Sequence, residues 1–161
     1  FRIAKRLVEP INYAITILNP YVQNQLSRED NDINFKDLIK NFLIPLIFVL
    51  TISYLSFGKN FIEFLSGKEF IEAYYPMLIL LIGYCTYLAT FWIRQLLLFN
   101  DLLQHHVVSK VISTVSFLVF SYFFVNQYGA SGLAIALSIS MILQKVYEFY
   151  IFNKFTKQTN K

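Results

Sequence analysis

The longest apolar pattern in the chain covers residues 111–144, which include no charged side chain. As one helix, these residues would extend roughly 50 Å, whereas the hydrocarbon core of a bilayer is about 30 Å thick. The polar segment 126–132, with its two glycines, interrupts the pattern and is typical of a turn. The pattern therefore predicts a helical hairpin with arms at 109–125 and 131–152. Two adjacent helices without a charged face are difficult to bury in a small soluble domain, so the hairpin favours a membrane protein.

Three further apolar segments precede the hairpin, and they predict spans at about 3–25, 41–57 and 76–98. A strongly polar loop at 27–40 separates the first two. Between the second and third, residues 58–75 mix apolar and charged positions and predict an amphipathic segment at the membrane interface. The expected fold class is therefore an all-α membrane protein, a polytopic bundle of about five transmembrane helices.

The first predicted span is polar along one face. Arg2, Lys5, Arg6 and Glu9 are spaced at i, i+3, i+4 and i+7, so they share that face. Polar or helix-breaking residues continue it: Asn12, Tyr13, Thr16, Asn19 and Pro20. The opposite face is apolar: Leu7, Ile11, Ala14, Ile15 and Leu18. In a bilayer, such a polar face must contact protein or a water-filled cavity rather than lipid.

Composition agrees with a membrane protein and narrows the classes of partner. The chain is 56% hydrophobic and 15% charged, whereas about a quarter of the residues are charged in soluble domains. The net charge is +4, but the basic residues lie at the ends of apolar segments, which argues against nucleic-acid binding. Cys85 is the only cysteine, so an internal disulfide or a multi-cysteine metal site is excluded.

The basic residues also predict an orientation. If successive spans alternate in direction, the loops at 27–40 and 100–110 share one side with the C-terminus. The basic residues on that side are Arg28, Lys36, Lys40, Arg94, Lys110, Lys154, Lys157 and Lys161. The other side has Lys59 and Lys68 besides the N-terminal group. By the positive-inside rule, we expect the C-terminus to be cytoplasmic. The basic residues of the N-terminal group would then be exceptions to this rule, and their position needs a separate explanation.

Several motifs occur in an order that resembles a known family. A helix ends at Asn19-Pro20, the stretch FLSGKEF at 64–70 precedes a span that begins at Pro76, and YGASGLAIA at 128–136 lies in the hairpin. This order resembles the C-terminal half of a Wzx-type polysaccharide flippase. That group belongs to the multidrug/oligosaccharidyl-lipid/polysaccharide exporter superfamily, with the MATE exporters and the lipid II flippases. Because the chain begins without methionine and already in a helical pattern, we expect a C-terminal fragment, 1–161, of a longer protein.

The resemblance implies a transporter rather than an enzyme, without cofactors, in the bacterial cytoplasmic (inner) membrane. Its two helical bundles would enclose a central cavity. Its substrate would be an undecaprenyl-diphosphate-linked oligosaccharide, moved from the cytoplasmic to the outer leaflet by alternating access for O-antigen, capsule or exopolysaccharide synthesis. The partners would be this lipid-linked glycan, the bilayer and other polysaccharide-assembly proteins.

The resemblance places Arg2, Lys5 and Arg6 in the cavity as the substrate-binding group. Arginine suits a diphosphate because its planar guanidinium binds oxygens in pairs. The alternative is that these side chains extend to lipid headgroups at the boundary. Glu9 either modulates the group or couples transport to a proton, or it is an intrahelical partner of Lys5 or Arg6.

Other charged positions have weaker functional hypotheses. Arg94 and Tyr87, on the polar and small face of the third span, are further candidates for the cavity, and Arg94 is alternatively a cytoplasmic anchor. Adjacent His105 and His106 point in different directions and lack a third ligand at suitable spacing, so we interpret them as surface-loop residues and predict no metal site. Lys145 and Glu148 predict a structural i,i+3 pair near the cytoplasmic end.

Three other functions remain as alternatives. A MATE-like cation-coupled exporter would need acidic residues in mid-membrane, and the spans after residue 41 include none before Glu148. An integral-membrane enzyme of polysaccharide assembly would need a loop with clustered catalytic groups, and the longest loop has none. A small membrane scaffold would consist of these five helices alone.

Overall fold

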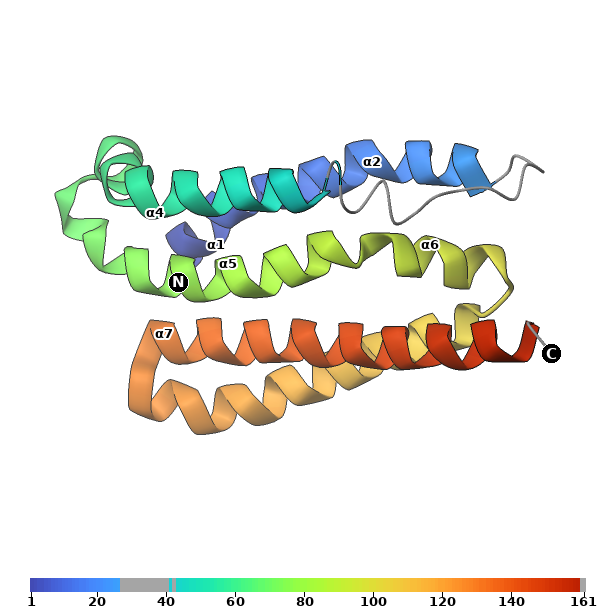
Figure 1. Ribbon diagram of the computed structural model, residues 1–161. Coiled ribbons are helices and arrows are strands. Elements are labelled where there is room, and N and C mark those ends of the chain that lie inside the picture. The colour runs from blue at the N-terminus through green and yellow to red at the C-terminus, as the bar shows by residue number, and fades with distance from the viewer. Residues whose placement is uncertain (27–40, 42, 160–161) are drawn as a thin grey trace.

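The computed structural model describes residues 1–26, 41 and 43–159, and the regular elements in this part of the chain are all helical (Figure 1). In chain order they are α1 (Arg2–Val8), α2 (Pro10–Leu26), α4 (Ile44–Ser66), the 3-10 helix η2 (Lys68–Ala73), α5 (Tyr74–Ala89), α6 (Phe91–Phe99) and α7 (Leu103–Thr159). The predicted all-α fold is confirmed for these residues. The predicted polar loop at 27–40 lies outside them.

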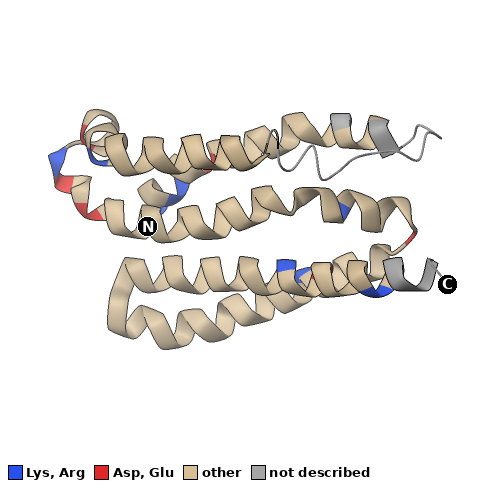
Figure 2. Ribbon diagram, viewed as in Figure 1, with Lys and Arg blue, Asp and Glu red and all other residues tan. Residues whose placement is uncertain are grey.

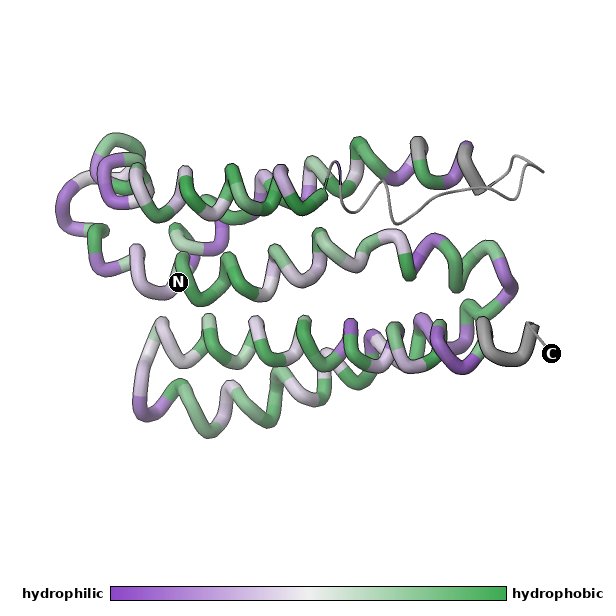
Figure 3. The backbone as a smooth tube through the Cα atoms, in the orientation of Figure 1, coloured by the Kyte–Doolittle hydropathy of each residue, from purple (hydrophilic) through white to green (hydrophobic). Residues whose placement is uncertain are grey.

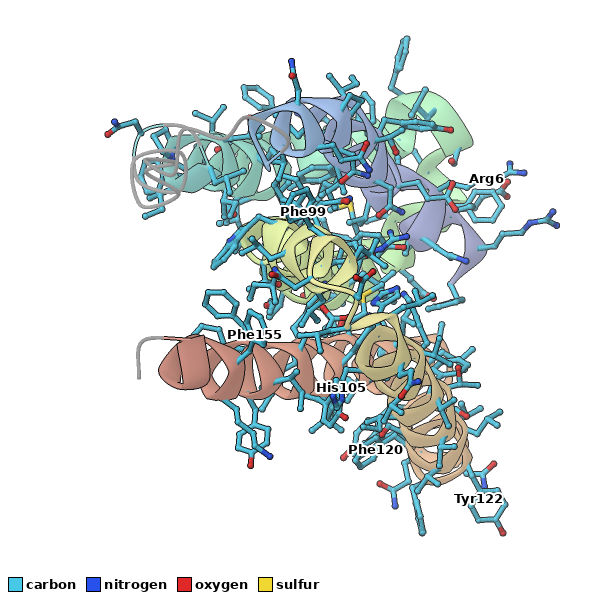
Figure 4. All side chains as sticks on the ribbon, turned by 90° about the vertical axis from the view of Figure 1, so that its right-hand side faces the viewer. Arg6, Phe99, His105, Phe120, Tyr122 and Phe155 are labelled. Carbon is cyan, nitrogen blue, oxygen red and sulfur yellow. The ribbon has the colours of Figure 1, made fainter. Side chains whose placement is uncertain are left out.

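The helices form three layers (Figures 1 and 4). Helices α2 and α4 make one outer layer, α5 and α6 the middle layer, and α7 the other outer layer. Helix α5 packs against α1, α4 and α7, while α6 packs against α2 and α7. The middle layer therefore supplies much of the buried core, including Met77, Leu80, Leu88, Ile93 and Leu97.

The two ends of the bundle collect different parts of the chain (Figure 1). The N-terminus, η2 and the turn of α7 lie at one end, which we call the N-terminal end. The turn between α6 and α7 and the C-terminus lie at the other, the C-terminal end. This arrangement matches the alternating directions that the sequence predicts.

Helix α7 is the predicted hairpin, folded at one residue. Gly129 has φ 53° and ψ −123°, a conformation that side-chain-bearing residues rarely adopt, and it divides the helix into arms at 103–128 and 130–159. The polar residues around Gly129 remain helical, so the turn is tighter and the arms are longer than the predicted 109–125 and 131–152. Gly132 allows the return, because a Cβ there would lie 2.1 Å from the Phe124 carbonyl oxygen.

The first and third predicted spans are each divided into two helices. The span predicted at 3–25 breaks at Glu9, because Pro10 has no N–H to continue the hydrogen-bond ladder and begins α2 instead. The span predicted at 76–98 breaks at Thr90, whose φ of −119° and ψ of 10° are not helical. Its start agrees with the sequence, since Pro76 lies in the first turn of α5.

The second predicted span is longer than the sequence indicated. Helix α4 continues through Gly58 to Ser66, so residues 58–66 belong to it and are not a separate interfacial segment. The chain then breaks at Gly67, whose φ of 98° favours glycine, and η2 follows. The boundary moves because a single glycine weakens a helix without ending it.

Three segments of the described residues are long and apolar enough to cross a membrane: Ile44–Ser66, Lys68–Phe99 and Leu103–Phe155. The third is the α7 hairpin, in which each of the two arms at 103–128 and 130–159 has the length of a membrane span. Figure 3 shows apolar residues along the length of these helices and hydrophilic residues mainly toward the ends of the bundle. Both outer layers leave large apolar side chains exposed: Phe48, Val49, Ile52 and Leu55 on α4, and Val111, Val115, Leu118 and Val119 on α7. Exposed apolar faces of this extent are typical of lipid contact.

The contact at Gly132 makes a testable prediction. A change of glycine to alanine inside a helix ordinarily stabilises by up to about 1 kcal/mol. We expect Gly132→Ala instead to destabilise the protein by about 1–3 kcal/mol, because the new methyl group meets the backbone of the opposite arm. Thermal unfolding in detergent measures this, with Ser131→Ala as the control that should change stability by less than about 0.5 kcal/mol. Stabilisation by Gly132→Ala would show that the arms do not approach closely at this point.

Candidate functional site

The predicted substrate-binding group lies on the exposed face of α1. Arg2, Lys5 and Arg6 are all exposed, whereas Leu7 and Val8 of the same helix are buried. The polarity continues along α2, where the exposed residues include Asn12, Tyr13, Thr16, Pro20, Gln23 and Asn24. The opposite face is buried through Ile11, Ile15 and Val22. The two-faced first segment predicted from the sequence is therefore confirmed, and we call its exposed side the α1–α2 polar face.

The cations of this face have no counter-ion in the described part of the chain. The ion pairs there are Lys68–Glu63, His106–Glu148 and Lys145–Glu148, and none of them includes a residue of α1. The Arg6 side chain points away from the other helices (Figure 4). Arg2 lines a groove of about 670 Å³, whose other walls include Glu72 of η2 and Tyr128 of the hairpin turn.

Glu9 does not pair with Lys5 or Arg6 among the described residues, so that hypothesis is wrong for this part of the chain. Glu9 occupies the break between α1 and α2, where its N–H donates to the Lys5 carbonyl oxygen at 3.0 Å. Its carboxylate interacts electrostatically with Tyr84 of α5.

A second polar group is buried between the arms of α7, and Glu148 is its centre. The Glu148 side chain is 0% exposed. Its Oε1 accepts hydrogen bonds from Ser109 Oγ at 2.8 Å and Gln144 Nε2 at 2.9 Å, and lies 3.2 Å from His106 Nδ1. Its Oε2 accepts from Lys145 Nζ at 2.7 Å. The carboxylate therefore connects both arms close to the C-terminal end of the bundle.

Three cations surround this carboxylate. Lys145 Nζ lies 4.2 Å from the centre of the Tyr87 ring, and Lys110 Nζ lies 5.7 Å from it. Arg94 of α6 is near enough to interact electrostatically with His106, Lys110 and Lys145. We call Tyr87, Arg94, His106, Ser109, Lys110, Gln144, Lys145 and Glu148 the buried charge cluster.

The buried charge cluster corrects the interpretation of the two histidines. His105 and His106 lie on α7, which begins at Leu103, and not in a surface loop. His106 is 8% exposed and contacts Glu148, while His105 Nδ1 lies 3.2 Å from the Tyr147 hydroxyl. Lys145 and Glu148 do form the predicted i,i+3 pair, but the pair is buried and reaches the other arm.

The sequence did contain a sign that polar residues of the two α7 arms face each other. Ser109 follows His106 by three residues, and Glu148 follows Gln144 by four, so each arm has two polar residues on one helical face. In a hairpin whose other buried positions are apolar, such faces are expected to meet. The sequence did not reveal that Arg94 and Tyr87 join them, since those residues come from another layer.

The two charged groups lie apart in the bundle. Figure 2 shows the basic residues of α1 near the N-terminal end and those of α6 and α7 toward the C-terminal end. Arg94 and Tyr87, candidates for the same cavity as Arg2, are therefore in a different place, on the face of α5 and α6 that packs against α7. On this face α5 packs closely against α7. Gly83 lies against Ser138, and Ser138 Oγ donates to the Ile79 carbonyl oxygen at 2.8 Å.

An amide network joins the middle layer to α2. Gln95 is 5% exposed, and its Nε2 donates to Asn19 Oδ1 at 2.9 Å. Its Oε1 accepts from Gln23 Nε2 at 3.2 Å. These bonds fix α6 against α2 at the C-terminal half of the polar face.

Comparison with family models, with curated proteins and with solved structures found no match. A function for this chain therefore rests on its own residues and their arrangement. The two groups that carry chemistry are the exposed cations of the α1–α2 polar face and the buried charge cluster.

The buried charge cluster generates a prediction about stability. We expect Glu148→Leu to destabilise the protein by about 3–5 kcal/mol, because Lys145 would remain buried without its counter-ion. In the double variant Lys145→Met/Glu148→Leu, much of the lost stability should return, since the buried lysine and its counter-ion are then removed together. Unfolding in detergent measures both variants.

The exposed pair Lys68–Glu63 is the matched control. Its Nζ–Oε1 distance is 3.4 Å and its side chains are 84% and 43% exposed. Glu63→Leu should therefore change stability by less than about 1 kcal/mol. Equal effects of Glu63→Leu and Glu148→Leu would contradict the burial of Glu148.

Proposed function

We propose that this chain is the C-terminal part of a flippase that moves a diphosphate-linked lipid glycan across the bacterial cytoplasmic membrane. The observation that carries the proposal is the α1–α2 polar face. It presents Arg2, Lys5 and Arg6 without counter-ions in the described part of the chain, beside helices long and apolar enough to span a bilayer. A cationic face in that position needs a partner other than lipid tails, and it forms no ion pair with the described residues.

The chemistry of a diphosphate fits this face. An unpaired diphosphate in the hydrocarbon region would cost many kcal/mol, so its path requires cations inside the membrane profile. Arg2 and Arg6 are one helical turn apart, which places two guanidinium groups on the same side of α1. The exposed hydroxyl and amide side chains farther along α2 offer hydrogen bonds to a glycan. The order of motifs that resembles the Wzx-type flippases supports the same substrate class.

A cation-coupled exporter has less support. Such a protein needs a membrane-embedded acid that is available to a cation or a proton, and Glu148 is the buried acid of the described helices. Its oxygens already meet three hydrogen-bond donors and His106. A carboxylate held in this way joins the hairpin arms and leaves little room for an incoming cation.

The substrate assignment is tested by the double variant Arg2→Ala/Arg6→Ala in the full protein. We expect it to abolish export of the lipid-linked glycan, because the diphosphate loses both guanidinium groups, while expression and membrane insertion remain normal. Surface glycan and glycan accumulated in the inner leaflet measure export. The control is Lys59→Ala/Lys68→Ala, which removes the same charge from exposed positions of α4 and η2 and should leave export intact. Normal export by the arginine double variant would refute the proposed role of α1.

The orientation has its own test. If the spans alternate in direction, the sequence has more basic residues on the side of the C-terminus than on the other, so we place the C-terminus in the cytoplasm. Green fluorescent protein fused after Lys161 should therefore fluoresce, and alkaline phosphatase fused there should be inactive. The opposite pair of results would invert the topology and place Arg2 and Arg6 on the cytoplasmic side.

A further inference from the structure

The buried charge cluster has more positive than negative charge. Arg94, Lys110 and Lys145 are its cations, and Glu148 is the only carboxylate among its residues. Asp101 is close in sequence, but it lies exposed in the turn after α6 and joins no ion pair of the described residues. Two of the positive charges therefore form no ion pair among the described residues, and such a charge is costly where it is partly buried, as that of Arg94 is.

Glu148 is not able to neutralise all three cations. An ionised carboxylate has about four acceptor positions. Ser109, Gln144 and Lys145 donate to it, and His106 lies at hydrogen-bond distance. Lys145, at 2.7 Å, is the cation that Glu148 pairs with. The surplus therefore belongs to Arg94 and Lys110.

Neither Arg94 nor Lys110 contacts an anionic partner among the described residues. The Arg94 Nε atom is buried and has no hydrogen-bond partner in the described structure. Lys110 Nζ donates to the neutral Gln144 Oε1 at 3.4 Å and lies 5.7 Å from the centre of the Tyr87 ring. Its side chain is exposed. Buried N–H donors are ordinarily satisfied, so an orphaned guanidinium nitrogen beside an unpaired lysine indicates a missing acceptor.

We propose that Arg94 and Lys110 bind a phosphate group between α6 and the first arm of α7. Arginine binds phosphate oxygens through its planar fork, and lysine adds a point charge. Both residues lie roughly 8–10 Å along their helices from the turn that joins α6 to α7. If these helices span a bilayer, that depth is within reach of the lipid phosphates at the C-terminal end of the bundle.

Two sources share this chemistry, namely the headgroup of an anionic lipid and free phosphate. The site is distinct from the α1–α2 polar face, which lies on another layer and whose cations are nearer the opposite end. It therefore does not depend on the proposed transport activity. Its occupant would neutralise the surplus charge and hold α6 against α7.

The experiment measures binding to the purified full protein in an uncharged detergent. The probes are phosphatidylglycerol, phosphatidylcholine with the same acyl chains, and inorganic phosphate. Bound molecules are counted by native mass spectrometry, and the unfolding temperature is followed by far-ultraviolet circular dichroism. We expect phosphatidylglycerol to bind and to raise the unfolding temperature, and phosphatidylcholine to do neither. A rise with inorganic phosphate as well would identify free phosphate as a sufficient ligand.

The test variant is Arg94→Gln/Lys110→Gln. It should weaken binding of the active probe by at least about tenfold, since the phosphate loses its hydrogen bonds to two charged groups, which are stronger than those to neutral ones. The control Lys59→Gln/Lys68→Gln removes the same net charge from exposed positions and should bind as the unaltered protein does. Equal binding by the test variant, or no binding of either phosphatidylglycerol or inorganic phosphate, would overturn the proposal.

Stability without ligand separates this site from a purely structural pair. Removing two unpaired cations relieves their mutual repulsion, so the ligand-free test variant should unfold at the same temperature as the unaltered protein or higher. A lower unfolding temperature would mean that Arg94 and Lys110 already have partners inside the bundle, and the site would not exist.

Discussion

The Glu148 carboxylate is the interaction on which the C-terminal half of the structure depends. It lies at the open base of the α7 hairpin, opposite the turn at Gly129, and receives hydrogen bonds from both arms. Without it the arms would have mainly apolar contacts, which specify register weakly between helices that are as apolar as their surroundings. One fully buried charge thus fixes which residues of the two arms face each other, and the second arm then presents Lys145 to Tyr87 of the middle layer.

The layered arrangement separates two kinds of charged group. The middle layer of α5 and α6 is the most buried part of the bundle, and it lies between α7 and the layer that includes α2 (Figure 1). Of the cations next to α7, Lys145 is consequently buried and Arg94 partly buried, while Lys110 is exposed, and the three share one carboxylate. Cations of α1 are exposed and form no ion pair in the described chain. Enclosure makes the first group a candidate for a bound phosphate, and exposure makes the second a candidate for a passing substrate.

Both proposals use the same physical argument. A cation that belongs to a bundle long and apolar enough to span a membrane, and that has no counter-ion among the described residues, implies an anion from outside them. The groups differ in what surrounds them. The α1–α2 polar face continues through amide and hydroxyl side chains, as a glycan requires, whereas Arg94 and Lys110 are bordered by Tyr87, Gln144 and apolar side chains. A long polar ligand suits the former and a single phosphate suits the latter.

The sequence by itself determined the helices, their alternating order, the hairpin and the two faces of the first segment, because each depends on local periodicity or on one glycine-containing turn. It also indicated the Lys145–Glu148 pair, which is separated by less than one helical turn. It did not determine that α4 continues through Gly58, since a single glycine leaves the choice between bend and helix to packing. Only the tertiary structure decided that His106 is buried, that Ser109 reaches Glu148 and that Arg94 and Tyr87 join them. Those contacts cross between helices, and their register is set by close packing, such as that of Gly83 on Ser138, which no local pattern encodes.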